Sequence, residues 1–333
     1  MLTFYRNNQP FVIFSIVFTA FVLWTPYFID PDIFLRDLTF QKQPLDIMSL
    51  VYSWNKYFLF SISLILCLFL AFQVSYINLS QQLIEKRNYL PALFFLLSMS
   101  WIPDLKIHVN SLIALIFIAF AFNIMLSSYS QKNNLFAFFD TGLLIGLASL
   151  FYFPFSVFLL VLGIAIILFQ MPAWRNFLTS IIAFLVPWLF YYGIYYFING
   201  SVRELNQLIN NLLFSSQAFR DFNALQWIFT GVSILTILLS SVHFVKNINH
   251  MTVRGKRVFY LFLWTFIILL IQYFVLPIHE SMILLGVAIP LSFLFTLYFS
   301  VIKSNWKGNL IFNFYFFSIL IAQYMFVFKA EIF

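Results

Sequence analysis

Three aspartates stand together directly after the first long apolar run of this chain. The stretch FIDPDIFLRD, residues 28 to 37, contains Asp30, Asp32 and Asp37, although the whole sequence has only 11 acidic residues. A carboxylate beside hydrocarbon has a raised proton affinity unless a cation pairs with it, and it can then serve as a general base. Alternatively, these aspartates form only a solvated collar, that is, a group of hydrated charges at a helix end, where charges are common.

Four further polar residues stand where they could join these aspartates. Arg203 and Arg220 bracket a polar stretch, and His279 and Glu280 lie in PIHES, residues 277 to 281. Arginine binds phosphate through paired hydrogen bonds. We therefore expect these residues to line an outward pocket that binds an anionic lipid head group.

Metal, disulfide and soluble-enzyme chemistry are not indicated. The four histidines are scattered, and no nucleotide-binding, HExxH, GxSxG or EF-hand pattern occurs. The single cysteine, Cys67, lies in an apolar run and excludes an intramolecular disulfide or a CxxC pair. We predict no metal site, and the identity of any cofactor stays open.

The composition identifies an integral membrane protein. Of the 333 residues, 63% are hydrophobic and 9% charged, and the mean hydropathy is +0.95. This is too little polar surface to cover a water-soluble globule. No segment alternates apolar and polar residues as the strands of a membrane barrel do. We expect an all-α polytopic transmembrane bundle that forms one membrane domain over 1–333. The basic residues that give the net charge of +7 lie in loops between membrane segments, so we expect no nucleic-acid partner.

Eleven apolar segments are predicted to form membrane helices. The segment at 91–103 is too short to cross about 30 Å of hydrocarbon alone, so we expect it to be tilted, broken or buried among neighbours. The predicted segments are 11–29, 58–78, 91–103, 109–127, 138–153, 155–170, 178–198, 226–245, 258–277, 281–302 and 309–328.

The basic residues predict the orientation. With a cytoplasmic N-terminus, eleven of the 18 basic residues fall in inner loops, including VRGKR at 253–257. Lysine and arginine favour the cytoplasmic side, so we expect the N-terminus inside and the C-terminus outside the membrane. The external face then holds most of the acidic residues.

Two external loops are predicted to carry helices that lie in the membrane interface. In the first loop, 30–57, the stretch QPLDIMSLVYSWNKYF has apolar residues at roughly helical spacing. In the second, 199–225, Ser201 and Glu204 form a capping box, and one apolar face follows in SVRELNQLINNLLFSS. The second helix lacks a lysine-rich face, which favours a role as part of an external cleft.

Small residues predict one close helix contact. In FDTGLLIGLASLFYFP, residues 139 to 154, Gly142 and Gly146 have the GxxxG spacing that lets another helix approach the backbone. Pro154 is expected to end this segment and to start a tight return into 155–170.

The N-terminal half resembles the core of integral membrane glycosyltransferases of the GT-C type. The likeness covers residues 10–170: a first helix followed by acidic residues, an interfacial helix, RNYLPALFFLL and FDTGLLIGLASLFYFP. It implies a polyprenyl-phosphate sugar donor at the external face, with an acidic residue of the first external loop as base. Here that residue would be Asp32, Asp30 or Asp37. The chain departs from that type in lacking an adjacent Asp-Glu pair and a sizeable external domain. It is also similar to a family of multi-pass inner-membrane proteins of unknown function found in Bacteroidota.

Two functions from different classes follow. The first is sugar transfer from a polyprenyl-phosphate carrier to an envelope acceptor, with membrane lipids as partners. The alternative is a non-catalytic subunit or scaffold of a secretion, motility or surface-assembly complex, whose aromatic surface holds partner helices. A lipid flippase or transporter is a weaker fit, because no charged residue lies securely at mid-membrane and no inverted repeat is visible.

Overall fold

The protein is a helical bundle with several helices long enough to cross a membrane. The computed structural model describes residues 5, 10–31, 43–81, 83, 88–100, 108–129, 135–171, 174–200, 210, 253–275, 282–301 and 305–332. Within these ranges the regular structure is helical, without strands. Six helices are sufficiently long and apolar: α2 (Pro10–Ile29), α5 (Lys56–Gln81), α7 (Val109–Ser128), α10 (Trp174–Asn199), α13 (Val253–Val275) and α14 (Ile283–Val301). The prediction of a multi-pass, all-α membrane protein is confirmed.

The other described helices are not among these six. They are α4 (Met48–Trp54), α6 (Leu90–Met99), α8 (Leu135–Phe151), the 3-10 helix η2 (Phe153–Val157), α9 (Phe158–Leu168) and α15 (Asn305–Ile332). A short helix is present in the first loop as α4, although it begins at Met48 and leaves Leu45 outside. Its position in the membrane interface stays a prediction. The predicted span 226–245 lies outside the described residues, as does the predicted helix of the second loop apart from Asn210.

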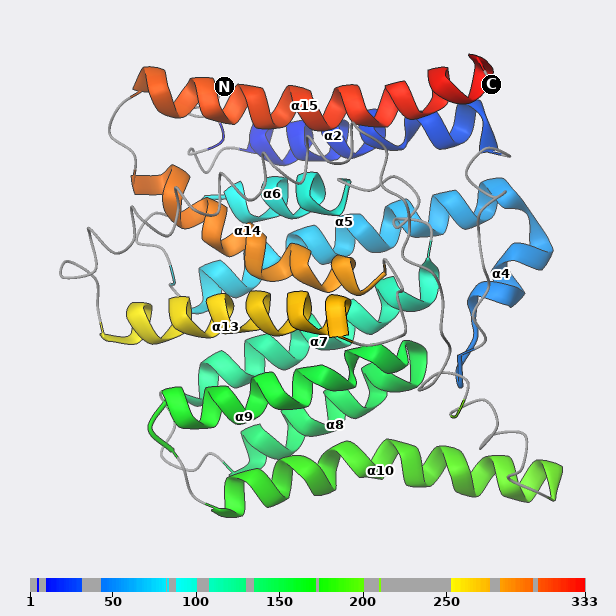
Figure 1. Cartoon of the computed structure of the whole chain (residues 1–333), viewed down its shortest axis with the longest axis vertical. Coiled ribbons are helices and arrows are strands. Elements are labelled where there is room, and N and C mark those ends of the chain that lie inside the picture. The colour runs from blue at the N-terminus through cyan, green and yellow to red at the C-terminus, as the bar shows by residue number, and fades with distance from the viewer. Residues whose placement is uncertain are drawn as a thin grey trace.

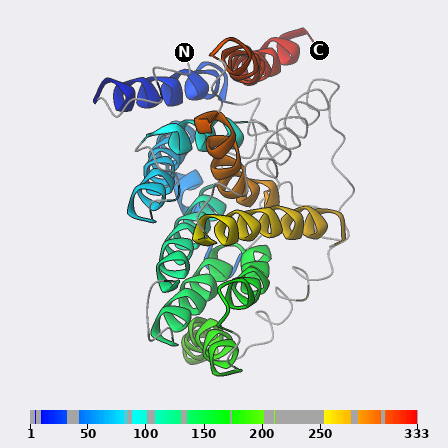
Figure 2. The ribbon, with the colours of Figure 1, turned by 90° about the vertical axis from the view of Figure 1, so that its left-hand side faces the viewer.

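The long helices lie side by side in a stack. Figure 1 shows α2 and α15 along one edge and α10 along the opposite edge. Figure 2, a view turned by 90°, places α13 and α14 between these edges. The helices from α5 to α10 run in alternating directions (Figure 1). One end of the stack, where α2 and α10 finish, is called the α4 end. The opposite end, where α13 begins, is called the α13 end.

The short helix α6 is buried among its neighbours, chiefly α5 and α14. All of its residues are buried. Its Phe94 stacks on Phe299 of α14 with ring centroids 5.1 Å apart, and meets Phe312 of α15 edge-on at 5.9 Å. Ser75 of α5 accepts a hydrogen bond from the main-chain N–H of Ala92 at 3.0 Å, which satisfies one donor of the first turn. Of the three alternatives expected for 91–103, tilted, broken or buried among neighbours, the described part of the segment shows burial.

Gly142 and Gly146 bring the backbones of α8 and α10 into contact. A Cβ atom on Gly142 would lie 2.5 Å from the carbonyl oxygen of Ser180, and one on Gly146 would lie 2.5 Å from that of Phe184. Any larger side chain would collide with main-chain atoms of α10, which cannot rotate away. The close helix contact predicted from the GxxxG spacing is therefore confirmed.

The turn at Pro154 is also as predicted. Helix α8 ends at Phe151, and η2 carries Pro154 in its first turn before α9 starts at Phe158. Proline suits this position, because the first helical N–H groups have no partner within the helix. The carbonyl oxygen of Pro154 accepts a hydrogen bond from Nε2 of Gln272 in α13 at 2.6 Å, so the turn is fixed to a second part of the bundle.

We expect Gly146→Ala to lower the midpoint of thermal unfolding in detergent, because the new methyl group must push α10 away from α8. Overpacking of this kind costs about 1 to 3 kcal/mol. Gly193→Ala in α10 is the matched control, because a Cβ atom there meets nothing within 4 Å. Alanine replaces glycine with a gain of roughly 0.5 to 1 kcal/mol in a helix. Equal midpoints for the two variants would contradict the close contact.

Candidate functional site

The candidate site lies at the α4 end, where the acidic stretch begins. Asp30 follows the last residue of α2, and its main-chain N–H donates to the carbonyl oxygen of Pro26 at 3.2 Å, so it continues the last turn. Its carboxylate is half-buried and meets no donor among the described residues. The other residues proposed for the site lie outside the described residues: Asp32, Asp37, Arg203, Arg220, His279 and Glu280. The structure therefore places Asp30 alone of this set.

The segment Gln43–Met48, which we call the latch, is hydrogen-bonded to the ends of several helices. Oε1 of Gln43 accepts from the N–H of Phe153 at 3.2 Å, and the N–H of Leu45 donates to the carbonyl oxygen of Leu150 at 3.0 Å. The hydroxyl of Tyr191 in α10 donates to the carbonyl oxygen of Pro44 at 2.6 Å. The latch thus joins the end of α8, the start of η2 and the last part of α10.

Asn110 of α7 fixes the far end of the latch. Its Oδ1 accepts from the N–H groups of Ile47 and Met48, both at 3.0 Å, and its Nδ2 donates to Oδ1 of Asp46 at 2.9 Å. Oδ1 of Asp46 also accepts from the N–H of Ser49 at 3.3 Å. The two side chains together satisfy the exposed donors at the start of α4. Asp46 is therefore committed to holding the loop, which distinguishes it from Asp30.

Besides the glycine contact, a polar contact holds α10 against α8 and so keeps α10 next to the latch. Nε1 of Trp188 donates to Oγ of Ser149 at 2.8 Å, and this hydroxyl donates to the carbonyl oxygen of Gly146 at 2.7 Å. The indole also meets Phe153 edge-on, with centroids 5.7 Å apart. The glycine contact, Trp188 and Tyr191 thus follow one another along α10 toward the α4 end.

Sequence reasoning did not identify the latch partners. These residues stand far apart in the chain: Gln43 begins the polar–apolar stretch of the first loop, Asn110 lies in the first turn of the predicted span 109–127, and Tyr191 lies inside the predicted span 178–198. A signal was present in Asn110, because an amide in the first turn of an apolar segment must find a partner. The sequence does not say which partner it finds.

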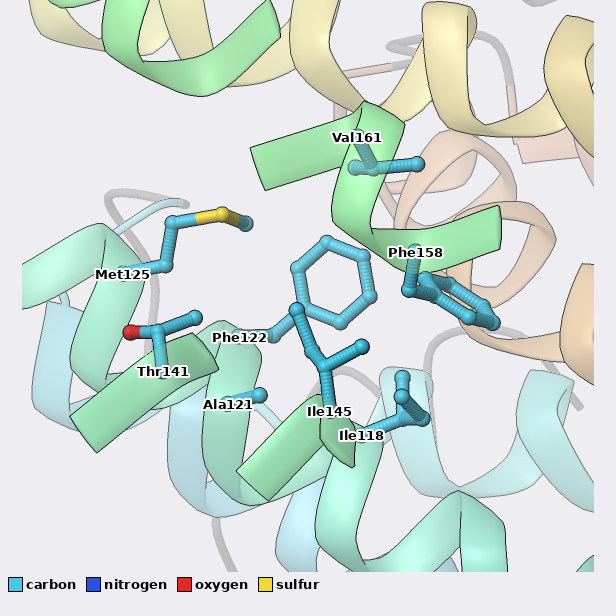
Figure 3. A pocket seen from close by; sticks show the side chains of 8 residues that line it. All are labelled: Ile118, Ala121, Phe122, Met125, Thr141, Ile145, Phe158 and Val161. Atoms are coloured by element: carbon cyan, nitrogen blue, oxygen red, sulfur yellow. The ribbon is translucent and has the colours of Figure 1, made fainter. Parts of the chain in front are cut away.

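The cavity between α7, α8 and α9 does not offer a substrate site. Figure 3 shows its lining, which is apolar apart from Thr141. It leaves about 10 Å³ for the centre of a water molecule, enough for roughly one water. The hydroxyl of Thr141 donates to the carbonyl oxygen of Ala137 within its own helix at 2.7 Å. No group of three or more metal-ligating side chains occurs in the part of the chain that the structure describes.

Comparison with known proteins gives one family. The model of a family of unknown function, DUF6427, matches residues 44–332, and the chain belongs to that family. The match begins within the latch and so follows Asp30, Asp32 and Asp37. No curated protein and no solved structure matches the chain.

We expect Asn110→Ala to destabilise the α4 end, because it leaves two main-chain donors and a carboxylate without their partner. The cost of such buried groups is about 1 to 3 kcal/mol each, so the unfolding midpoint in detergent should fall by several degrees. The fall in the unfolding midpoint caused by Asp46→Ala should be smaller in the Asn110→Ala protein than in the wild-type protein, because the two side chains share hydrogen bonds. The exposed Asp140→Ala is the control and should change little. Additive effects of the Asp46 and Asn110 substitutions would contradict the network.

Proposed function

We propose that this family member is a bacterial inner-membrane protein of glycosyltransferase-like fold, of the GT-C type. It transfers a sugar from a polyprenyl-phosphate carrier to an envelope acceptor at the external face. The family description supplies no activity, so the proposal rests on the residues of the α4 end and on the resemblance of residues 10–170.

One observation carries the proposal: the loop that bears the aspartates is anchored on both sides. Asp30 continues the last turn of α2, and the latch after Asp37 is bonded to α7, α8, η2 and α10. A catalytic carboxylate must be held in place relative to the bundle, because misplacement by about 1 Å lowers rates steeply. Fixing both flanks of the acidic stretch is the arrangement that such a loop requires.

The proposed reaction divides the polar residues between two tasks. A hydroxyl group of the acceptor attacks the anomeric carbon of the carrier-bound sugar, the bond from that carbon to the phosphate oxygen breaks, and polyprenyl phosphate leaves. The hydroxyl proton passes to Asp32, or to Asp30 or Asp37 beside it. The residues proposed to hold the carrier phosphate are those of the second external loop and of the helix end near 279: Arg203, Arg220, His279 and Glu280.

The geometry at Asp46 supports placing the base earlier in the loop. Its Oδ1 is already shared between Nδ2 of Asn110 and the N–H of Ser49. These two hydrogen bonds use Asp46 to hold the start of α4, so we assign it a structural role. Asp30 has no such bonds among the described residues.

The alternative proposal is a non-catalytic subunit that uses the outer face of α2 to contact partner helices. Phe11, Phe14, Phe18 and Phe21 are each more than half exposed, at 65%, 65%, 60% and 54%, and they follow helical spacing. Such a row packs equally well against lipid chains or against the helices of a partner protein. Under this alternative the aspartates form only a solvated collar, and the apolar surface performs the function.

The catalytic proposal is tested by Asp32→Asn, which keeps the shape of the side chain but removes its ability to accept a proton. We expect transfer in membrane vesicles supplied with polyprenyl-phosphate sugars to fall by about 10² to 10⁴, since a general base contributes that much. Expression and detergent stability should not change. Asp140→Asn is the control and should keep full activity. If Asp30, Asp32 and Asp37 can all become asparagine without loss of the cellular phenotype, the catalytic proposal fails and the subunit remains.

The proposed orientation, with eleven spans and a cytoplasmic N-terminus, is tested at the two ends of α10. Trp174 and Asn199 are both exposed and stand at opposite ends of this helix. In a background with the buried Cys67 replaced by serine, we expect Asn199→Cys to react with an impermeant thiol reagent added to spheroplasts. Trp174→Cys should react only after lysis, because basic residues keep its side of the membrane inside. Labelling in the opposite order would reverse the assignment.

A further inference from the structure

A cluster of three basic residues lies at the α13 end, away from the site described above. Arg254, Lys256 and Arg257 all fall in the first turns of α13. That helix begins with no acidic residue, and within the described chain no carboxylate pairs with these three side chains. The N-terminus of a helix carries a partial positive charge, so cations there repel it. An anion bound at this position would offset the charge.

Arg254 is held in place by the ends of two other helices. Its Nη2 donates to Oε1 of Gln81 at the end of α5, at 2.5 Å, and to the carbonyl oxygen of Leu126 near the end of α7, at 3.2 Å. Gln81 is in turn fixed by its Nε2, which donates to Oδ1 of Asn123 at 3.2 Å. The guanidinium is therefore oriented before any ligand arrives. Its Nε is buried without a hydrogen-bond acceptor.

Tyr129 connects the two arginines. The guanidinium carbon of Arg254 lies 5.8 Å from the centre of the tyrosine ring, and that of Arg257 lies 5.5 Å from it. Both distances allow cation–π attraction, which keeps two like charges close together on one aromatic ring. Two neighbouring guanidinium groups whose donors are only partly used by the described residues can bind a group that carries several acceptor oxygens.

The exposed side of α13 indicates what that group belongs to. Tyr260 and Trp264 follow Arg257 on the same face of the helix and are 41% and 46% exposed. Ile271 continues this apolar row and is 54% exposed. An acyl chain can lie along the row while its head group meets the basic cluster. The internal cavity of Figure 3 is too small to receive such a chain.

We propose that Arg254, Lys256 and Arg257 form a binding site for the phosphate of an anionic phospholipid. The lipid head group lies at the start of α13 and supplies acceptors to both guanidinium groups and to the lysine. Its acyl chain lies along Tyr260 and Trp264. Because Arg254 also contacts α5 and α7, the bound lipid stabilises the junction of three helices at this end of the bundle.

The test compares lipids on the purified full-length protein. Thermal unfolding in a zwitterionic detergent is followed with added phosphatidylglycerol, phosphatidylcholine or inorganic phosphate. We expect phosphatidylglycerol to raise the midpoint by several degrees at concentrations where the other two do little. Equal protection by phosphatidylcholine would overturn the proposal. Full protection by inorganic phosphate alone would assign the site to a soluble phosphate and overturn the lipid assignment.

Two variants separate the site from general surface charge. Arg257→Gln should weaken the apparent affinity for phosphatidylglycerol about tenfold, because it removes a charge-assisted contact. Should that variant fail to fold, Lys256→Gln provides the same readout. The control is Arg175→Gln, because Arg175 also stands at a helix start and lies 5.9 Å from an aromatic ring, that of Trp174. If Arg175→Gln weakens binding as much as Arg257→Gln, the effect is general attraction and the proposed site does not exist.

Discussion

Direct backbone contact between α8 and α10 is the constraint on which the α4 end depends. Helices in a membrane gain little by hiding apolar surface from one another, so they associate where small residues allow close packing. Gly142 and Gly146 provide this contact, and Ser180 and Phe184 lie against them. With α10 in this position, Trp188 reaches Ser149 and Tyr191 reaches the latch. A larger spacing between the two helices would break both hydrogen bonds.

The two ends of the bundle differ in how their polar groups are hydrogen-bonded. At the α4 end, Asp46 and Asn110 satisfy each other and the donors that begin α4, so the polar atoms are used to build structure. At the α13 end, Arg254 is anchored on one side while its Nε lacks an acceptor, and its basic neighbours have no described carboxylate. A buried donor without a partner is costly in a low-dielectric setting. The latch uses its polar groups to hold the loop in place, whereas the basic cluster is inferred to be a binding site.

The proposed roles at the two ends are physically compatible. Sugar transfer at the α4 end requires a fixed loop, and the latch ties that loop to α7, α8 and α10. Lipid binding at the α13 end joins α5, α7 and α13. Helix α7 takes part in both, through Asn110 at its start and Leu126 and Tyr129 at its finish. The two sites therefore share a rigid element without sharing a residue.

The sequence by itself determined the properties that depend on short stretches of chain. Apolar runs of about 20 residues identify a helical membrane protein, the spacing of Gly142 and Gly146 predicts a close helix contact, and Pro154 predicts a turn. Each of these signals is local, so it can be read without knowing the neighbours. The three aspartates were also visible in this way, although the structure places only Asp30. Tertiary structure decided the partners: Asp46 meets Asn110 across 64 residues, and Arg254 meets Gln81 across 173. Polar side chains inside a membrane must pair, but which ones pair is set by the packing of helices that lie far apart in the chain.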